Sequence, residues 1–286
     1  MKTTAPATKF SLWRTEQLYN IDFASYALSH HSFSRHFHDH YVIELVTKGV
    51  DNFYCDGRNY TAQNDQLVLI NPGEVHTGNT VSDIPLHYYS LYPGKKELEQ
   101  VAAILGISLP VNFCFQRSLV DSSLLTQKLR LFFDSLGSGQ VSLQQQEIFF
   151  DCMYELLQPA SRNNHQSISC HSKNERIQLL TGFIRSHFKE NISLQQLSGL
   201  VSLDPFHLTR LFKKAVGVSL YEYLLIIRTE HARQLLRKGL KVREAAVQSG
   251  FYDSSHFNRI FYKMNGASPK SFRSSKSQYC TRFAEQ

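Results

Sequence analysis

Four side chains in the first third of the chain have the composition of a ligand set. His38 and His40 are two residues apart, Glu44 follows on the same alternation, and His76 comes after a Pro-Gly turn. Three imidazoles and one carboxylate suit Fe, Mn, Ni or Zn. Alternation along a strand predicts that His38, His40 and Glu44 share one face. The same groups could instead hydrogen-bond to one another inside the protein, or bind a small polar molecule.

A second chemically distinctive group lies in an internal repeat near the other end of the chain. Residues 207–219 align with residues 256–268 at an offset of 49, and six of these thirteen positions are identical: His, Arg, Phe, Lys, Gly and Ser. Asp204 and Asp253 also coincide, three residues before each segment. Chance would give about one match, so the segment is a duplicated structural unit.

The charge is divided unevenly along the chain. Residues 1–165 contain 12 Lys and Arg against 16 Asp and Glu, whereas residues 166–286 contain 19 against 8. A mildly acidic half is therefore joined to a strongly basic half, and the basic half is suited to binding a polyanion such as nucleic acid.

The elements that must position the histidines are short strands. Residues 34–92 contain strand-like segments separated by turn signals, among them Asp56-Gly57 and Asn71-Pro72-Gly73, which predicts a β-sandwich or barrel. An N-terminal arm of about 20 residues is expected to precede the first strands. Residues 95–105, 122–136 and 143–157 show helical spacing. The polar segment 159–173 is interpreted as a linker.

Each repeat unit has the pattern of a helix-turn-helix. In the first, Ser193 begins a short helix, and Asp204 followed by Pro205 begins a second helix that Gly217 ends. In the second, the short helix covers 242–249, and a helix that begins at Asp253 or Ser254 ends before Gly266. A second helix after a tight turn is the geometry that enters a major groove.

A helix over 219–238 is expected to connect the two units. About 20 residues span about 30 Å, close to the separation of successive major-groove faces, about 34–36 Å. One chain could thus place two recognition helices in adjacent grooves. Outward-facing side chains near the helix starts are candidates for base contact, and nearby lysines for phosphate contact. The DNA-binding candidates are Phe206, Thr209, Arg210, Lys213, Lys214, Ser254, Ser255, Asn258, Arg259 and Lys263.

Residues 175–275 resemble the AraC/XylS family of bacterial transcription regulators. The most specific stretch runs from Gly250-Phe251 through Ser255-His256-Phe257 to Ser268-Pro269 and Phe272-Arg273. The sequence departs from the family pattern at Ala245-Ala246 and at Ser249, where the family more often has Ile-Ala and Val. The resemblance implies base contact by the outward-facing residues Phe206, Thr209, Arg210, Ser254, Ser255, Asn258 and Arg259. It also implies, usually, activation of transcription.

The N-terminal region resembles the sensor domain of the same family, a cupin-like barrel that binds a small effector. The His38/His40/Glu44/His76 set resembles the cupin metal constellation, but in these regulators such histidines commonly occur without a metal, so no metal or other cofactor is expected. The resemblance adds Lys48 and Tyr88 as candidates. The expected effector-binding residues are His38, His40, Glu44, Lys48, His76 and Tyr88.

The sequence thus predicts an α+β protein with two domains and no catalytic residues. A cupin-like effector-binding and dimerisation domain covers 1–158, a linker 159–173, and a DNA-binding domain 174–286 with helix-turn-helix units at 193–217 and 242–266. The expected partners are double-stranded promoter DNA, a small polar effector, RNA polymerase and a second copy of the chain. Five cysteines without CxxC spacing, no membrane segment and no secretory signal favour a cytoplasmic protein. The alternatives are a metal-dependent cupin enzyme tethered to a DNA-binding module, and a constitutive DNA-binding protein whose barrel only dimerises.

Overall fold

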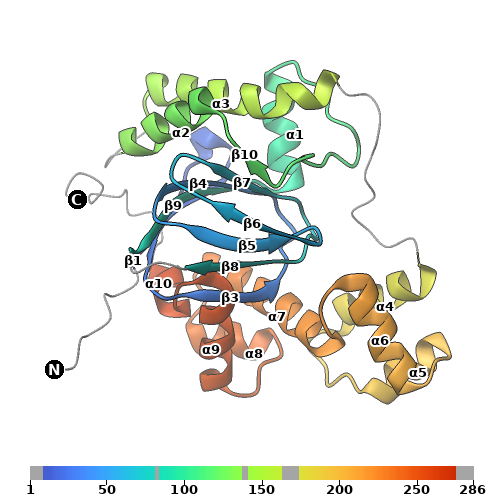
Figure 1. Cartoon of the computed structure of the whole chain (residues 1–286). Helices are drawn as coiled ribbons and strands as arrows, with labels where there is room; N and C mark the ends of the chain where they lie inside the picture. Colours follow the sequence, from blue (N-terminus) through green and yellow to red (C-terminus); the bar gives the residue numbers. More distant parts are fainter. Residues whose placement is uncertain (1–8, 81–83, 137–140, 163–173, 275–286) are drawn as a thin grey trace.

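The computed structural model describes residues 9–80, 84–136, 141–162 and 174–274. Two antiparallel β-sheets form the centre of the molecule (Figure 1). Helices α1–α3 cover the outer face of one sheet, and helices α4–α10 lie on the opposite side of the barrel (Figure 1). The predicted α+β architecture, a cupin-like barrel followed by an all-helical region, is confirmed.

The sheets contain six and four strands in the described residues. The larger sheet has the order β1-β2-β9-β4-β7-β10, and the smaller has the order β3-β8-β5-β6. The bounds of the strands are β1 Lys9–Arg14, β2 Asp22–Leu28, β3 Ser32–His36, β4 Val42–Lys48, β5 Asp51–Cys55, β6 Arg58–Ala62, β7 Leu67–Ile70, β8 His76–Thr80, β9 Leu86–Tyr92 and β10 Leu119–Val120. A short 3-10 helix, Glu16–Leu18, joins β1 to β2.

The central strand β4 is buried on both faces. Ile43 and Leu45 pack with Phe149 and other aromatic side chains under α1 (Lys95–Ile104), α2 (Ser123–Ser135) and α3 (Leu143–Arg162). Val42 and Val46 belong to a separate cluster between the two sheets. Alternating side chains of one strand therefore join two hydrophobic cores, because successive residues point to opposite faces.

The predicted hairpin at Asp56-Gly57 is present between β5 and β6. Both turn residues have positive φ, 47° for Asp56 and 76° for Gly57. Two such residues form the type of two-residue turn that matches the twist of the strands, and glycine adopts this conformation without a steric penalty.

Three expectations about the N-terminal half are wrong. Strands begin at Lys9, so the expected 20-residue arm contains all of β1. His38 and His40 lie in the loop between β3 and β4 rather than on one strand with Glu44. The linker does not begin at residue 159, because α3 continues through Pro159 to Arg162; a single proline removes only one helical donor. Residues 163–173 lie outside the described residues.

The helical half carries the two expected helix-turn-helix units. Its helices are α4 Glu175–His187, α5 Leu194–Val201, α6 Pro205–Val216, α7 Leu220–Arg237, α8 Val242–Gln248, α9 Ser254–Asn265 and α10 Pro269–Ser274. The side chains of Ser193, Asp204 and Asp253 accept hydrogen bonds at the starts of α5, α6 and α9, as predicted. Gly217 and Gly266 end α6 and α9 in the left-handed conformation.

Candidate functional site

A pocket opens between the two sheets and is closed by the helical half. Its cavity volume is about 70 Å³. The walls come from β2–β5 and β7–β9 of the barrel, with Arg233 of α7 and Met264 and Asn265 at the end of α9. The pocket is therefore shared by the two halves of the chain.

The structure places only some of the expected effector-binding residues around the pocket. His38, Glu44, His76 and Tyr88 line the pocket. His40 and Lys48 are not among its lining residues. Lys48 is exposed at the end of β4, and the ring of His40 stacks on that of His38 at 4.7 Å and turns toward the helical half.

Several pocket residues were missed by the sequence analysis. His36 and His38 have the same spacing as His38 and His40. His36 lines the pocket together with Asp51 and three tyrosines, among them Tyr26 and Tyr92. The spacing of two histidines was the available signal for His36. No local signal existed for Arg233, which lies far along the chain and reaches the pocket only through tertiary packing.

Burial makes the imidazoles of this site neutral at pH 7. It lowers the pKa of His36, His38 and His40 well below the usual value, and neighbouring imidazoles or Arg233 lower the pKa further. Burial lowers the pKa of His76 to about 4. Desolvation disfavours a charged imidazole, so each of these rings has one nitrogen with a lone pair and one N–H donor.

The two carboxyl groups of the pocket shift in the opposite direction. Burial and the neighbouring Asp51 raise the pKa of Glu44 well above its usual value. Burial raises the pKa of Asp51 to about 7, although the backbone N–H of Asn79 donates to its Oδ1 at 3.0 Å. A protonated carboxyl can donate as well as accept a hydrogen bond.

Replacing Asp51 by Asn should change the pH dependence of stability. The folded-state pKa of about 7 lies above the ordinary value of 3.8. Between about pH 4 and about pH 7, the folded protein therefore holds a proton that the unfolded chain has lost. The unfolding free energy of the wild type is consequently highest below about pH 4 with respect to this group, and it falls as pH rises through about 7. The advantage of Asp51→Asn over wild type in unfolding free energy should grow from about pH 4 to about pH 7 and then level off.

Urea unfolding at a series of pH values tests this expectation. Each unit of pKa difference corresponds to about 1.4 kcal/mol, so the effect is measurable. The side-chain amide introduced at position 51 would keep an acceptor for the Asn79 N–H. Asp56→Asn, at the exposed hairpin turn, is the control and should show no such trend; equal behaviour of the two variants contradicts the expected burial effect.

Arg233 is the side chain that α7 contributes to the pocket, and it is poorly neutralised. Its side chain is 4% exposed, and Nε has no hydrogen-bond partner. Nη1 lies 3.2 Å from His40 Nε2 and 3.5 Å from Glu230, and Nη2 lies 3.9 Å from Asp22. A buried guanidinium without close partners is costly, so an acceptor on a molecule in the pocket would be favoured next to Arg233, which lines it.

Further contacts join the barrel to the ends of both recognition helices. Arg35 Nη1 donates to the Gly217 carbonyl at 3.3 Å at the end of α6. At the end of α9, a Cβ on Gly266 would lie 2.9 Å from the ring of Phe33, so the end of α9 packs closely against β3. The barrel therefore touches the C-terminal ends of α6 and α9 directly.

The ten DNA-binding candidates are all exposed on α6 and α9. Leu208 and Phe212 of α6, and Phe257 and Phe261 of α9, are fully buried. The predicted division of each helix into an apolar face and a free face is confirmed. Phe206 is 64% exposed, and its ring lies 5.5 Å from the Arg210 guanidinium carbon.

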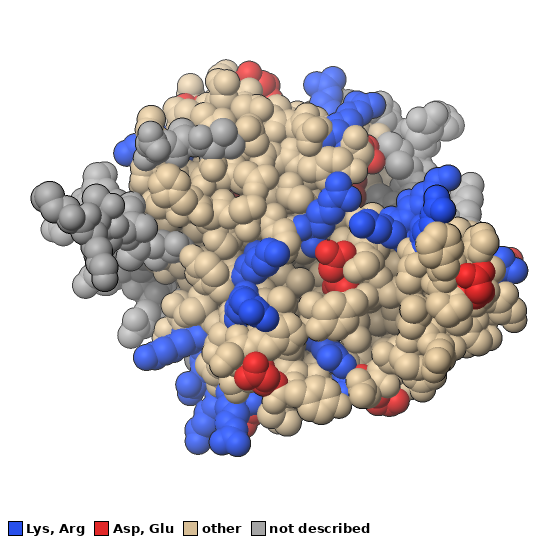
Figure 2. Space-filling view, turned by 60° about the horizontal axis from the view of Figure 1, so that its bottom comes forward, with Lys and Arg blue, Asp and Glu red and all other residues tan. Residues whose placement is uncertain are grey.

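Figure 2 looks toward the side of the molecule that bears the helical half, where Lys and Arg outnumber Asp and Glu. Lys213, Lys214 and Lys263 lie in the last turns of α6 and α9. Helix α7 contains 18 residues between the two units, or about 27 Å. An exposed basic surface on two repeated helices is the electrostatic requirement for binding DNA.

The four residues that resemble the cupin metal constellation are not the ones that the fold brings together as possible metal ligands. In the described residues, the groups that could hold a metal ion are His36, His38 and His76, and a second group of His38, His40 and Glu230. Glu44 belongs to neither group; its Oε2 accepts a hydrogen bond from Ser90 at 3.5 Å. The displacement of His38 and His40 from β4 into the preceding loop explains the difference.

Comparison with known proteins agrees with this architecture. The family model "AraC-like ligand binding domain" matches residues 19–153, and the model "Helix-turn-helix domain" matches residues 197–275. The chain belongs to the AraC/XylS family. It combines a ligand-binding domain with a helix-turn-helix domain and is a transcription regulator, as its relatives are named.

Two relatives match most of this AraC/XylS regulator. An uncharacterized HTH-type transcriptional regulator of Bacillus subtilis, YbfI, is 29% identical, over 78% of this chain and 81% of its own length. The lactose operon transcription activator of Staphylococcus xylosus is 26% identical, over 81% of this chain and 83% of its own.

Solved structures of ToxT from Vibrio cholerae share the fold of this AraC/XylS regulator. The apo form of a ToxT point variant has a TM-score of 0.58 and 16% identity, covering 89% of this chain and 97% of that one. Wild-type ToxT with a bound unsaturated fatty acid has a TM-score of 0.52 and 17% identity, covering all of both chains. Among the described residues, none of the helices combines the length and the apolar character needed to cross a membrane.

Proposed function

We propose that this AraC/XylS regulator is a sequence-specific activator of transcription that responds to a small polar effector. The effector domain extends to the end of α3, and the DNA-binding domain begins with α4. The DNA-binding domain binds promoter DNA in the cytoplasm and acts on RNA polymerase. The lactose operon activator of S. xylosus, similar along most of its length, supports activation as the direction of control.

The observation that carries this proposal is the pocket shared by the two halves of the chain. A ligand can shift an equilibrium only if it binds one arrangement better than the other. Arg233 lies on α7, the helix that connects the two helix-turn-helix units, and Asn265 is the last residue of α9. A ligand in this pocket contacts both halves, so its binding depends on how they are placed.

The lining of the pocket supports a polar effector. Neutral imidazoles of His38 and His76, the carboxyl of Glu44 and the hydroxyl of Tyr88 supply donors and acceptors in a small volume. The Arg233 guanidinium adds a positive charge to the wall of the pocket. A sugar, an amino acid or a similar molecule satisfies such groups better than a hydrocarbon chain does.

Thermal unfolding in the presence of sugars, amino acids and other small metabolites tests the sensor. A molecule that binds the folded protein raises its unfolding midpoint. Glu44→Gln should reduce this increase, whereas Glu147→Gln, on the exposed side of α3, should leave it unchanged. The affinity of the protein for DNA that it has selected from a random library is then measured with and without the ligand. A ligand that raises the midpoint but leaves DNA affinity unchanged would refute the proposed response.

The regulator is proposed to act as a homodimer through the helices above the larger sheet. Leu124 and Leu131 of α2 are 56% and 62% exposed and lie seven residues apart, so they share one face of the helix. Leu131→Glu should convert dimer to monomer in light scattering after size-exclusion chromatography. Val111→Glu, at an exposed position before β10, should remain dimeric. A wild-type monomer at high concentration would exclude this arrangement.

The enzyme alternative gains no support from the two relatives that match most of the chain, which are named as a transcription regulator and a transcription activator. The alternative of a barrel that serves only for dimerisation is less consistent with the pocket, because a purely structural barrel has no need to gather imidazole and carboxyl groups around a cavity.

A further inference from the structure

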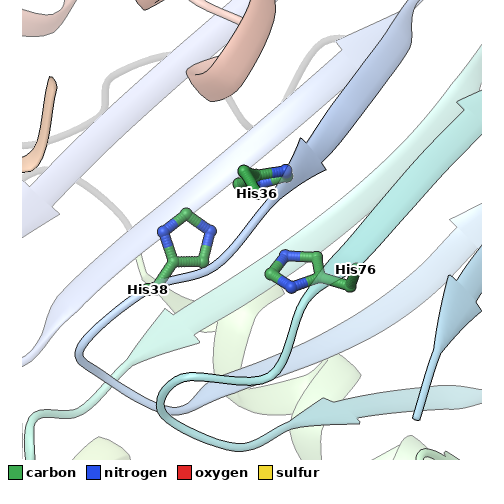
Figure 3. A group of neighbouring side chains, drawn as sticks. All are labelled: His36, His38 and His76. Carbon is green, nitrogen blue, oxygen red and sulfur yellow. The ribbon is translucent and has the colours of Figure 1, made fainter. Parts of the chain in front are cut away.

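Three imidazoles converge on one wall of the pocket. His36 ends β3, His38 lies in the following loop, and His76 begins β8 (Figure 3). Their ring centroids lie 4.3 Å apart for His36 and His76, 4.8 Å for His36 and His38, and 5.2 Å for His38 and His76. One ring nitrogen from each lies within 4.8 Å of the others.

Backbone carbonyl groups fix the tautomer of two of these rings. Nδ1 of His36 lies 2.7 Å from the Ser34 carbonyl oxygen, and Nδ1 of His76 lies 2.9 Å from the Glu74 carbonyl oxygen. A carbonyl oxygen only accepts, so each Nδ1 carries the proton and each Nε2 keeps its lone pair. The same relation orients the imidazoles of known metal centres, where the second nitrogen donates to a carbonyl.

We propose that His36, His38 and His76 form a binding site for a divalent transition-metal ion such as Zn²⁺. Three protein ligands leave one position of a tetrahedral ion open toward the pocket. This inference goes beyond the proposed function, because it concerns a metal ion held by the protein and does not require that the effector or the DNA has been identified.

The distances require only a small closure of the site. Zn–N bonds of about 2.0–2.1 Å separate tetrahedral ligand atoms by about 3.4 Å, compared with the limit of 4.8 Å here. The ring of His38 can move toward the other two, because His38 lies in a loop and not in a strand. The hydrogen bonds of His36 and His76 leave their Nε2 atoms available without any rearrangement.

The surroundings select the class of ion. Glu44 and Asp51 line the same pocket, and the guanidinium of Arg233, close to His40, adds positive charge near it. Weakly held ions such as Mg²⁺ and Ca²⁺ require several oxygen ligands. Imidazole ligands favour transition-metal ions such as Zn²⁺, Ni²⁺ and Cu²⁺.

Titration calorimetry of the full chain with Zn²⁺, after removal of metals by a chelator, tests the site. We expect one strong site per chain, and binding weaker by about 100-fold or more in His76→Gln, which removes one of three ligands. His207→Gln removes a histidine whose side chain is 76% exposed and should bind Zn²⁺ as wild type does. Absence of a strong site in wild type, or equal binding by His76→Gln and wild type, overturns the proposal.

Two further variants separate this site from its neighbour and from a loss of folding. His40→Gln should bind Zn²⁺ as tightly as wild type. If His40→Gln loses the strong site while His76→Gln keeps it, the ion binds at His38, His40 and Glu230 instead. That result would show the proposal to be wrong. His76→Cys replaces one ligand by a thiolate, and with Co²⁺ it should gain a thiolate-to-cobalt charge-transfer band. A folded His76→Cys protein that binds Co²⁺ without this band also overturns the proposal.

Discussion

Replacing Arg210 by Ala should weaken binding to the preferred DNA sequence by about 1–3 kcal/mol, or roughly 5- to 150-fold, and remove the preference for one base pair. Arg210 is exposed on the first half of α6, and its guanidinium stacks against the exposed ring of Phe206. Buried Leu208 and Phe212 hold the opposite face of the helix. This support leaves the guanidinium free to form two parallel hydrogen bonds with a guanine.

A lysine on the same helix provides the contrast. Lys214→Ala should weaken binding to all sequences equally, because a phosphate contact carries no sequence information. It should also lower the number of counterions released on binding, and so the slope of the salt dependence, by about one. Arg259→Ala, at the position in α9 that matches Arg210, should affect specificity in the same way but at a different base pair.

Selection of DNA from a random library by each protein, followed by fluorescence anisotropy at several salt concentrations, measures both effects. Arg117→Ala removes an exposed arginine of the barrel and is the control for net charge. If Arg210→Ala and Arg117→Ala lose the same affinity and retain the same base preferences, Arg210 does not read the DNA.

The helix-turn-helix units could be predicted from the sequence because their signals are local. The side chain of Asp204 accepts hydrogen bonds from backbone groups two and three residues away, and Gly217 ends the helix through its own backbone conformation. The repeat then doubled the evidence. Exposure of Arg210 follows from helical spacing relative to Leu208 and Phe212.

The binding pocket could be predicted only in outline, because tertiary contacts determine its walls. The pattern of histidines indicated the region, but the register decided that His36 and not His40 lines the pocket. A shift of one element by two residues is invisible in an alternating His-x-His-x-His run. Arg233 shows the larger difficulty: its place on α7 follows from the pattern, but its contact with His40, 193 residues away, depends on the packing of two domains.

Replacing Asp22 by Asn should have the largest effect on stability of any single substitution at the interface between the domains. Asp22 is 2% exposed at the start of β2. Its Oδ1 accepts a hydrogen bond from Arg14 Nε at 2.7 Å, its Oδ2 contacts the guanidinium of Arg237, and Arg233 lies 3.9 Å away. One buried carboxylate thus compensates guanidinium groups from both domains.

The expected loss is about 3–5 kcal/mol in unfolding free energy, because removing one partner leaves buried charges without compensation. Asp39→Asn is the matched control: Asp39 and Arg185 also join the two domains, with two contacts of 2.8 Å, but both side chains are more than 40% exposed. An exposed pair of this kind contributes about 1 kcal/mol or less. Urea unfolding followed by the fluorescence of Trp13 in β1, the single tryptophan, compares the two variants.

The same substitution also tests how the interface controls the regulator. Asp22 does not line the pocket, so Asp22→Asn weakens the contact between the domains without removing a pocket side chain. If the closed arrangement is the one that the effector recognises, a smaller closed population reduces the apparent effector affinity by the same factor. Asp22→Asn should therefore bind the effector more weakly than Asp39→Asn does. Equal stability and equal effector affinity in the two variants would show that the buried charge cluster does not hold the domains together.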